Sequence, residues 1–141
     1  MFSANPGFPL APLSEIASGG EKSRVLLAIK SIFSSFDQTN LLIFDEIDSG
    51  VSGSVSSYVA NLLSELSVHR QVFCVTHQPL IAAFADNHFA FKKTVIDGNT
   101  VSKLTYLKEI ADRQKELATL AGGEIVEAKA YAASLLEHKA A

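Results

Sequence analysis

The chain has 141 residues, of which 48% are hydrophobic and 19% charged, a composition that excludes a disordered chain and allows one domain, or half of a larger one, with a real core. The formal net charge of −3 argues against a broad nucleic-acid-binding face, so any contact with DNA requires a local cationic patch or other segments. The sequence has no apolar run near the roughly eighteen residues that cross a bilayer, no visible secretory signal and a single cysteine, Cys74. We therefore expect a cytoplasmic protein without a membrane partner.

The first half of the chain predicts strands that alternate with amphipathic helices. A short strand is expected over residues 2–5, and helical spacing of apolar residues predicts helices over residues 21–36 and about 55–66. Residues 41–44 are four consecutive apolar residues, typical of a strand buried on both faces of a parallel sheet, and residues 71–76 form a second such strand. This order predicts a parallel βαβ unit. The apolar face of its first helix would consist of Val25, Ile29, Ile32, Phe33 and Phe36.

The second half predicts a hairpin between helical segments. A short helix follows over residues 79–85, and strands over residues 88–95 and 100–107 flank Asp97-Gly98, a strong hairpin signal. Residues 109–138 are expected to be helical, with a break at two glycines. The fold class is therefore α/β, with parallel strands flanked by helices, a β-hairpin and a helical tail.

Carboxylates end the first apolar strand. Asp45 and Glu46 follow it directly, and His77 follows the next strand, so the three side chains are expected at one edge of a parallel sheet, where such sheets bind ligands. Asp45 suits Mg²⁺, directly or through water, since this ion prefers oxygen ligands. Glu46 is suited to deprotonate an attacking water, and His77 to donate to a terminal phosphate. A polar strand exit is the simpler interpretation of the two acids alone, but their agreement with His77 favours a site.

A second candidate element, Ser18-Gly19-Gly20-Glu21, begins the first long helix. Ser18 and Glu21 have the spacing of a capping box, and a helix N-terminus presents free N–H groups to a phosphate. An ordinary cap is the simpler interpretation, yet two adjacent glycines cost conformational entropy and indicate close approach of the backbone by a ligand. The G-x-x-x-x-G-K-[ST] phosphate loop occurs nowhere in the chain.

Other polar residues are assigned structural roles. Cys74 is expected to be a buried, unreactive thiol, and His88 to be a surface or packing residue. Lys92-Lys93 is interpreted as a solvated face in preference to a DNA site. Asp112, Arg113, Lys115 and Glu116 are expected on an exposed helix face.

In their order and spacing, these elements resemble the C-terminal half of an ABC-type ATPase head. Ser18–Glu21 corresponds to the signature motif, Leu41–Asp45 to the Walker B strand, Glu46 to the catalytic glutamate and His77 to the switch histidine. The chain is more narrowly similar to the SMC-like members that repair double-strand breaks in bacteria. Nearly the whole chain carries this similarity, at residues 2–7, 17–24, 48–53, 76–79 and 113–123.

The resemblance implies that two heads sandwich ATP and Mg²⁺ and that hydrolysis releases the heads. Asp45 would hold the metal, Glu46 and His77 would act on nucleotide bound to the same head, and the signature motif would contact the γ-phosphate bound to the other head. The cofactor-binding residues would be Ser18, Gly19, Gly20, Glu21, Ser49, Gly50 and Ser52. The last three belong to the D-loop, in which Ser52 stands where Asp is common.

The resemblance also implies partners. The phosphate loop, the Q-loop and a coiled coil precede the signature motif in this family, so residues 1–141 are expected to be a C-terminal lobe that is inactive as an ATPase alone. Its partners would be the N-terminal ATPase lobe of the same protein, a second head in a homodimer, and DNA through the intact protein. A bacterial, nucleoid-associated location follows. Half of another SMC-like or ABC ATPase, or a non-hydrolysing interaction module of the same fold, remains the alternative.

Overall fold

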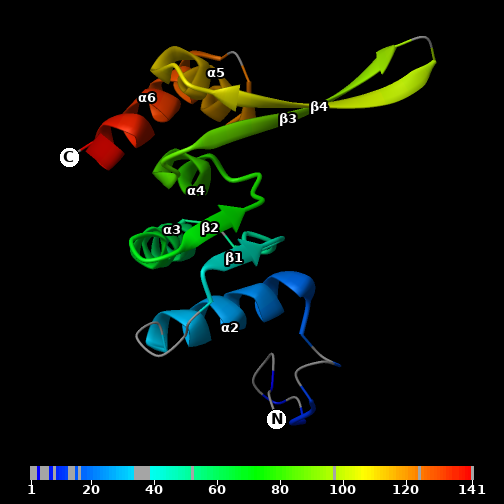
Figure 1. Cartoon of the computed structure of the whole chain (residues 1–141), viewed down its shortest axis with the longest axis vertical. Coiled ribbons are helices and arrows are strands. Elements are labelled where there is room, and N and C mark those ends of the chain that lie inside the picture. Colours follow the sequence, from blue (N-terminus) through cyan, green and yellow to red (C-terminus); the bar gives the residue numbers. More distant parts are fainter. Residues whose placement is uncertain are drawn as a thin grey trace. The chain divides into compact units, whose positions relative to one another are not determined.

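The computed structural model describes residues 3, 7, 9–12, 15, 17–33, 39–51, 53–96, 98–123 and 125–140. The predicted strand over residues 2–5 (apart from Ser3), the end of the first helix at Phe36, the D-loop residue Ser52 and the turn residue Asp97 lie outside the described residues. The chain divides into two compact units, Met1–His77 and Gln78–Ala141, drawn in Figure 1. No helix among the described residues is long and apolar enough to cross a membrane.

The first unit contains the predicted βαβ arrangement. Its elements are α2 (Gly19–Ile32), β1 (Leu41–Phe44), α3 (Ser54–Ser67) and β2 (Gln71–Cys74). β1 and β2 pair in parallel, with Leu41 opposite Gln71 and Phe44 opposite Cys74. The helices and both strands are confirmed, and α2 begins two residues before the predicted start because Ser18 caps it.

One face of the β1–β2 pair forms the core of this unit. Leu42 and Phe44 are buried while the alternate residues of β1 are exposed, as the two-residue period of a strand requires. α3 contacts both α2 and β2. The buried apolar side chains that this packing gathers are Leu27, Leu42, Phe44, Ile47, Val59, Ala60, Leu63 and Leu66.

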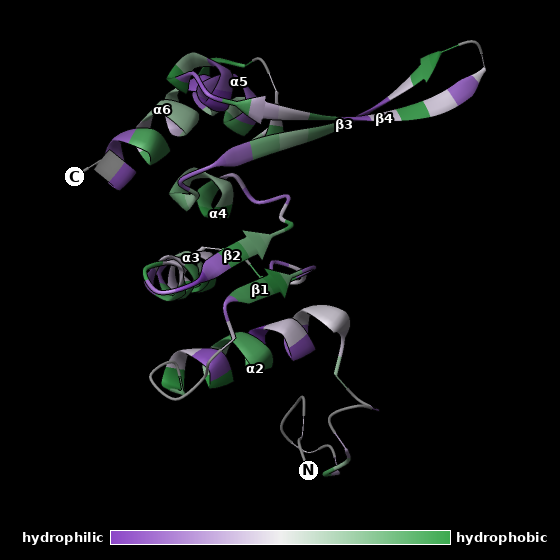
Figure 2. Ribbon diagram, in the orientation of Figure 1, coloured by the Kyte–Doolittle hydropathy of each residue, from purple (hydrophilic) through white to green (hydrophobic). Residues whose placement is uncertain are grey.

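The expectation that these strands are buried on both faces is wrong for this chain. Large apolar side chains of the other face remain exposed, namely Leu41, Ile43, Phe73 and Val75, with Ile43 64% exposed. Figure 2 shows β1 as an apolar ribbon and β2 as apolar after its hydrophilic first residue, Gln71. Parallel sheets normally carry helices on both faces, and the described part of this unit does not cover the second face.

The predicted apolar face of the first helix is exposed as well. Ile29, Ile32 and Phe33 are 48%, 73% and 54% exposed, whereas Leu27, outside that predicted face, is 1% exposed and packs inside the unit. Helical periodicity finds an apolar face correctly, but it does not reveal whether the covering layer belongs to the same segment.

The second unit contains the predicted hairpin and three helices. α4 (Pro79–Phe84) precedes β3 (His88–Ile96) and β4 (Asn99–Leu107), which pair antiparallel over their whole length. α5 (Ile110–Leu120) and α6 (Val126–Ala140) follow, so the hairpin and the broken helical tail are both confirmed. α5 ends in a Schellman motif, in which Gly123 N donates to Ala118 O at 2.8 Å and Gly122 has a φ of 129° that disfavours a side chain.

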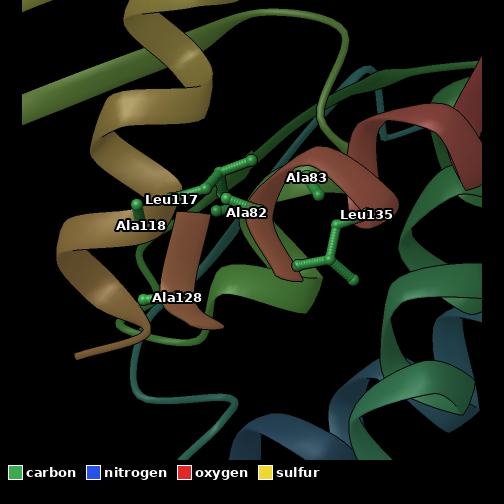
Figure 3. Close-up of a cluster of buried hydrophobic side chains, with 7 residues drawn as sticks. Ala82, Ala83, Leu117, Ala118, Ala128 and Leu135 are labelled. Atoms are coloured by element: carbon green, nitrogen blue, oxygen red, sulfur yellow. The ribbon is translucent and has the colours of Figure 1, made fainter. Parts of the chain in front are cut away.

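α4, α5 and α6 enclose a small alanine-rich core. Figure 3 shows side chains from the three helices pointing toward one another. The buried members are Ala82, Ala83, Leu117, Ala118, Ala128, Ala132 and Leu135. Alanine at most of these positions lets the helices approach closely, so that Leu117 and Leu135 provide most of the volume that fills the space between them.

Arg113 is not on an exposed helix face, as the sequence had suggested. Its Nη2 atom donates to Ala83 O at 3.2 Å and to Ala85 O at 2.7 Å, which satisfies carbonyl groups at the end of α4. A positive charge is also favourable at a helix C-terminus. Glu116 on the same helix instead pairs with Lys92 of β3 at 3.1 Å.

Replacement of Leu117 by Ala should destabilise the second unit strongly. Leu117 is 0% exposed in the three-helix core, and removing a buried leucine side chain typically costs about 2–5 kcal/mol. Ile110→Ala on the same helix is the matched control, since Ile110 is 72% exposed. Urea unfolding followed by circular dichroism measures both variants. Equal midpoints for the two variants would contradict this description of the core.

Candidate functional site

The carboxyl ends of β1 and β2 lie side by side, as predicted. Val75 N donates to Phe44 O at 2.9 Å, so the pairing continues past the last residue of β2. Asp45 and Glu46 leave β1 at this edge, and Thr76 and His77 leave β2 at the same edge. The parallel register therefore places Asp45, Glu46 and His77 at the same edge of the strand pair.

Asp48 fixes the end of β2 against the loop that follows β1. It is 2% exposed, and its Oδ2 atom accepts hydrogen bonds from Thr76 Oγ1 at 2.5 Å and from His77 N at 2.7 Å. The Nδ1 atom of His77 lies 3.0 Å from the same oxygen, while the His77 side chain remains 74% exposed. Burial acts to raise the pKa of Asp48, but the hydrogen bonds from Thr76 and His77 outweigh it and lower this pKa.

This arrangement orients the His77 imidazole. If Nδ1 donates to Asp48, the other ring nitrogen, Nε2, is left toward solvent and toward any ligand at the sheet edge. Sequence reasoning did not assign a role to Asp48. No local pattern marks it, because its hydrogen-bond partners Thr76 and His77 lie 28 and 29 residues further along the chain.

Asp45 has one carboxylate oxygen committed to the chain. Its Oδ1 atom accepts from Glu46 N at 2.9 Å, which leaves Oδ2 without a described partner. Glu46 itself has a φ of 57°, a left-handed conformation that is uncommon for residues other than glycine and recurs at functional sites. A single exposed carboxylate oxygen suits Mg²⁺, which is usually held by one or two carboxylates together with phosphates. The described residues contain no cluster of three His, Cys, Asp or Glu side chains that could hold a metal.

The predicted capping box at the start of α2 is confirmed. Ser18 Oγ accepts from Glu21 N at 3.2 Å, and Glu21 Oε2 accepts from Ser18 N at 2.8 Å. The backbone hydrogen bond from Ser18, followed by the one from its side chain, lowers the pKa of Glu21. Because Glu21 is used in the cap, its carboxylate is engaged within the helix terminus.

Two side chains of α2 tie the helix to the loop after β1. Ser23 Oγ donates to Asp45 O at 2.7 Å. Arg24 Nη1 donates to Ile47 O at 3.2 Å and to Ser49 O at 2.7 Å. Sequence reasoning quoted Arg24 only as part of a motif, since contacts to carbonyl groups more than twenty residues away leave no local pattern.

The Cα atoms of the two glycines face this loop. A Cβ atom at Gly20 would lie 2.8 Å from Glu46 O and 2.8 Å from Ser49 Cβ. A Cβ atom at Gly19 would meet the carboxylate of Glu46. In the described chain, its own loop is what approaches both glycines, and this brings the signature motif and Glu46 together.

The D-loop residues are partly described. Ser49 N donates to Glu46 O at 3.0 Å in a turn, and Gly50 has a φ of 70° that favours glycine. Both residues are exposed and stand beside the α2 terminus through the Arg24 contact, whereas Ser52 lies outside the described residues. Six of the seven predicted cofactor-binding residues are therefore described, and they gather at the α2 terminus and the adjoining loop.

Cys74 has the environment of an unreactive thiol. It is half-buried where full burial was expected. Burial, followed by the charges of Asp48 and Asp45, raises its pKa to about 12. A thiol with this pKa is protonated at neutral pH and is a poor nucleophile.

On this βαβ unit, the signature-like helix, the strand ending in two acids and the histidine after the next strand have the order of the C-terminal lobe of an ABC-type ATPase head. No protein-family model matches the chain. The chain is similar over nearly all its length to the DNA repair protein RecN, which confirms the resemblance to SMC-like repair ATPases.

RecN proteins of several bacteria show this similarity. The chain is 49% identical to RecN of Synechocystis sp. over 99% of its own length and 27% of the relative's. It is 43% identical to RecN of Bacillus subtilis, with 97% and 24% covered, and 45% identical to that of Deinococcus radiodurans, with 90% and 22% covered. The chain thus spans about a quarter of the length of these relatives.

A solved structure is also similar to the chain. It comes from work on ATP-driven dimerization and DNA-stimulated activation of SMC ATPases. The two share 28% sequence identity, with 72% of this chain and 60% of that chain covered and a TM-score of 0.48.

Gly20→Ala should destabilise the first unit more than Gly19→Ala does. The new Cβ at position 20 would collide with backbone and with Ser49, a contact that costs about 1–3 kcal/mol where the surroundings are packed. At position 19 it would meet the end of a flexible side chain, which can turn away, and Ala is the better helix former. Chemical unfolding of both variants measures the difference. Equal stability of the two would contradict the packing of the loop on Gly20.

The lowered pKa of Asp48 predicts a pH dependence of stability. A carboxyl with a lowered folded-state pKa contributes stability that is fully present above its unfolded-state pKa, and this is lost as the pH falls through the folded-state pKa. The ordinary value is 3.8, so the free energy of unfolding should fall steeply below about pH 4. Asp48→Asn should flatten this dependence, and Asp112→Asn, on an exposed residue, should leave it unchanged. Urea midpoints measured across the acid range test this, and parallel profiles for wild type and Asp48→Asn would refute it.

Proposed function

We propose that the chain is the C-terminal ATPase lobe of a RecN-like protein that acts in double-strand-break repair and recombination. The observation that carries the proposal is the single edge at which Asp45, Glu46, His77 and the α2 terminus meet. Parallel pairing of β1 with β2 supplies the first three, and Arg24 attaches α2 to the same loop. The similarity to RecN over almost the whole chain supports the same function.

In this proposal each residue has a distinct task. Asp45 holds Mg²⁺ through the carboxylate oxygen that the chain leaves available, and Glu46 accepts a proton from the attacking water. Protonated His77 donates from Nδ1 to Asp48 and from Nε2 to the terminal phosphate as negative charge develops there. Bound Mg·ATP supplies the phosphoryl group that is cleaved.

The α2 terminus serves the nucleotide of a second head. Ser18 Oγ accepts from Glu21 N, so its hydroxyl proton is available for donation to a phosphate oxygen. Gly19 and Gly20 present backbone where no side chain intervenes. In this proposal Ser49, Gly50 and Ser52 of the D-loop line the same contact between heads.

The exposed apolar surfaces of the first unit support an N-terminal ATPase lobe as a partner. Ile43 and Phe73 are exposed on the uncovered sheet face, and Ile32 and Phe33 on α2. A parallel sheet is stable when both faces are covered, and such a lobe would also bring the phosphate loop that this chain lacks. DNA would bind the intact protein, and a cytoplasmic, nucleoid-associated location would follow.

The second candidate is an interaction module of the same fold that does not hydrolyse ATP. The contact of the Glu46 carboxylate with Gly19 favours it, because in this arrangement the proposed base faces the helix terminus. Half of another SMC-like or ABC ATPase is less well supported, since the relatives reported above are RecN proteins.

Glu46→Gln in the full-length protein containing this lobe tests the proposal. Gln keeps the shape of Glu but removes the proton acceptor, so hydrolysis should fall by about 10²–10⁴-fold while ATP affinity changes little. Asp45→Asn should instead weaken Mg²⁺-dependent ATP binding. The 141-residue chain alone should show no turnover. Single-turnover kinetics and nucleotide-binding titrations measure these quantities. Near-wild-type hydrolysis by Glu46→Gln would exclude Glu46 as the base, whereas no hydrolysis by the wild-type full-length protein would favour the interaction module.

A further inference from the structure

Positive charge is concentrated in the β3–β4 hairpin. Residues 88–108 contain four lysines and one acid, whereas the rest of the chain contains eight basic and fourteen acidic side chains. The overall charge of −3 therefore conceals a cationic segment on an otherwise acidic protein. Such segregation is typical of a local contact with a polyanion.

The hairpin presents three of these lysines together. Lys92 on β3 lies directly opposite Lys103 on β4, and Lys93 follows on the other face of the strand. All three are exposed. His88 and Ala90 at the base of β3 are buried. Residues 91–96 of β3 and residues 98–106, which include most of β4, are exposed.

The opposed lysines are electrostatically unfavourable in the isolated chain. Like charges directly across a strand pair destabilise a hairpin. Lys92 pairs with Glu116 at 3.1 Å, where the Lys92 side chain is 62% and the Glu116 side chain 14% exposed, so this one lysine has an acidic neighbour in the chain. No acidic partner of Lys93 or Lys103 is found among the residues that the structure describes. A bound anion between the strands would remove the repulsion.

We infer that the β3–β4 hairpin is a surface that binds double-stranded DNA through its phosphates. The contact is made by Lys92, Lys93 and Lys103. A two-stranded ribbon has dimensions that the major groove admits, and lysines on both faces of such a ribbon reach the phosphates that border the groove. The exposed hydroxyl of Thr105 lies on the face of Lys92 and Lys103 and is a suitable phosphate donor.

This inference deepens the proposed function, from which the choice of DNA follows, and it changes the interpretation of Lys92-Lys93 as a merely solvated face. A protein with an acidic surface has the same sign of charge as DNA, so the lysines of the hairpin would attract it as well. The hairpin also exposes Phe91 and Leu104 on its second face, at 61% and 63%. A protein partner is therefore the competing occupant that the experiment must separate from DNA.

The test is the affinity of the 141-residue chain for a fluorescently labelled duplex, measured by anisotropy without nucleotide over a series of salt concentrations. The variant is Lys92→Gln/Lys93→Gln/Lys103→Gln. Its control, Lys30→Gln/Lys115→Gln/Lys129→Gln, removes the same charge from helices. A third variant, Lys92→Arg/Lys93→Arg/Lys103→Arg, keeps the charge of the hairpin. Circular dichroism establishes that each variant is folded.

The hairpin glutamine variant should bind the duplex at least about tenfold more weakly at low salt. The negative slope of log K against log salt should become smaller in magnitude by about 2–3, because each phosphate contact contributes about 0.9 to it. The control and the arginine variant should stay close to wild type. Equal losses in the two glutamine variants, or no binding of duplex by the wild-type chain at low salt, would overturn the inference. Since the assay contains no ATP, either outcome leaves the ATPase proposal to its own test.

Discussion

The buried carboxylate of Asp48 is the constraint on which the first unit depends. It joins the loop after β1 to the residues that follow β2. Separating the two strand ends would therefore leave the Asp48 carboxylate without these hydrogen-bond donors, which is costly for a buried charge. The same loop is held from the other side by Ser23 and Arg24 of α2. One loop therefore determines the positions of the acids, the histidine and the helix terminus.

Local patterns were sufficient for the secondary structure. The four-residue apolar run of β1, the helix cap at Ser18 and the turn signal at Asp97-Gly98 each act within a few residues, and all the corresponding elements among the described residues are present. Exposure was harder to predict, since Ile43 and Ile32 have the pattern of core residues. Apolar periodicity marks a face that is favourable to bury, but it does not tell whether neighbouring residues of the same segment cover it.

Only part of the site could likewise be predicted from the sequence. Strand order alone predicted that Asp45 and His77 share an edge, because parallel pairing requires it. What fills the space beside Gly20 could not be predicted, since the answer is a carbonyl group twenty-six residues away in the chain. The roles of Arg24 and Asp48 could not be predicted for the same reason, because their partners are backbone atoms and side chains that only the fold brings close.

The β1–β2 pair has a consequence for how this polypeptide behaves in isolation. Among the residues that the structure describes, β1 and β2 pair only with each other, so each has an outer edge without a described neighbour. The face that these residues leave uncovered is apolar. Unpaired N–H and C=O groups next to exposed Ile and Phe side chains form a template for intermolecular strand addition. Such a surface favours concentration-dependent aggregation of the isolated segment. A polypeptide that covers this face would therefore prevent aggregation, as a chaperone does.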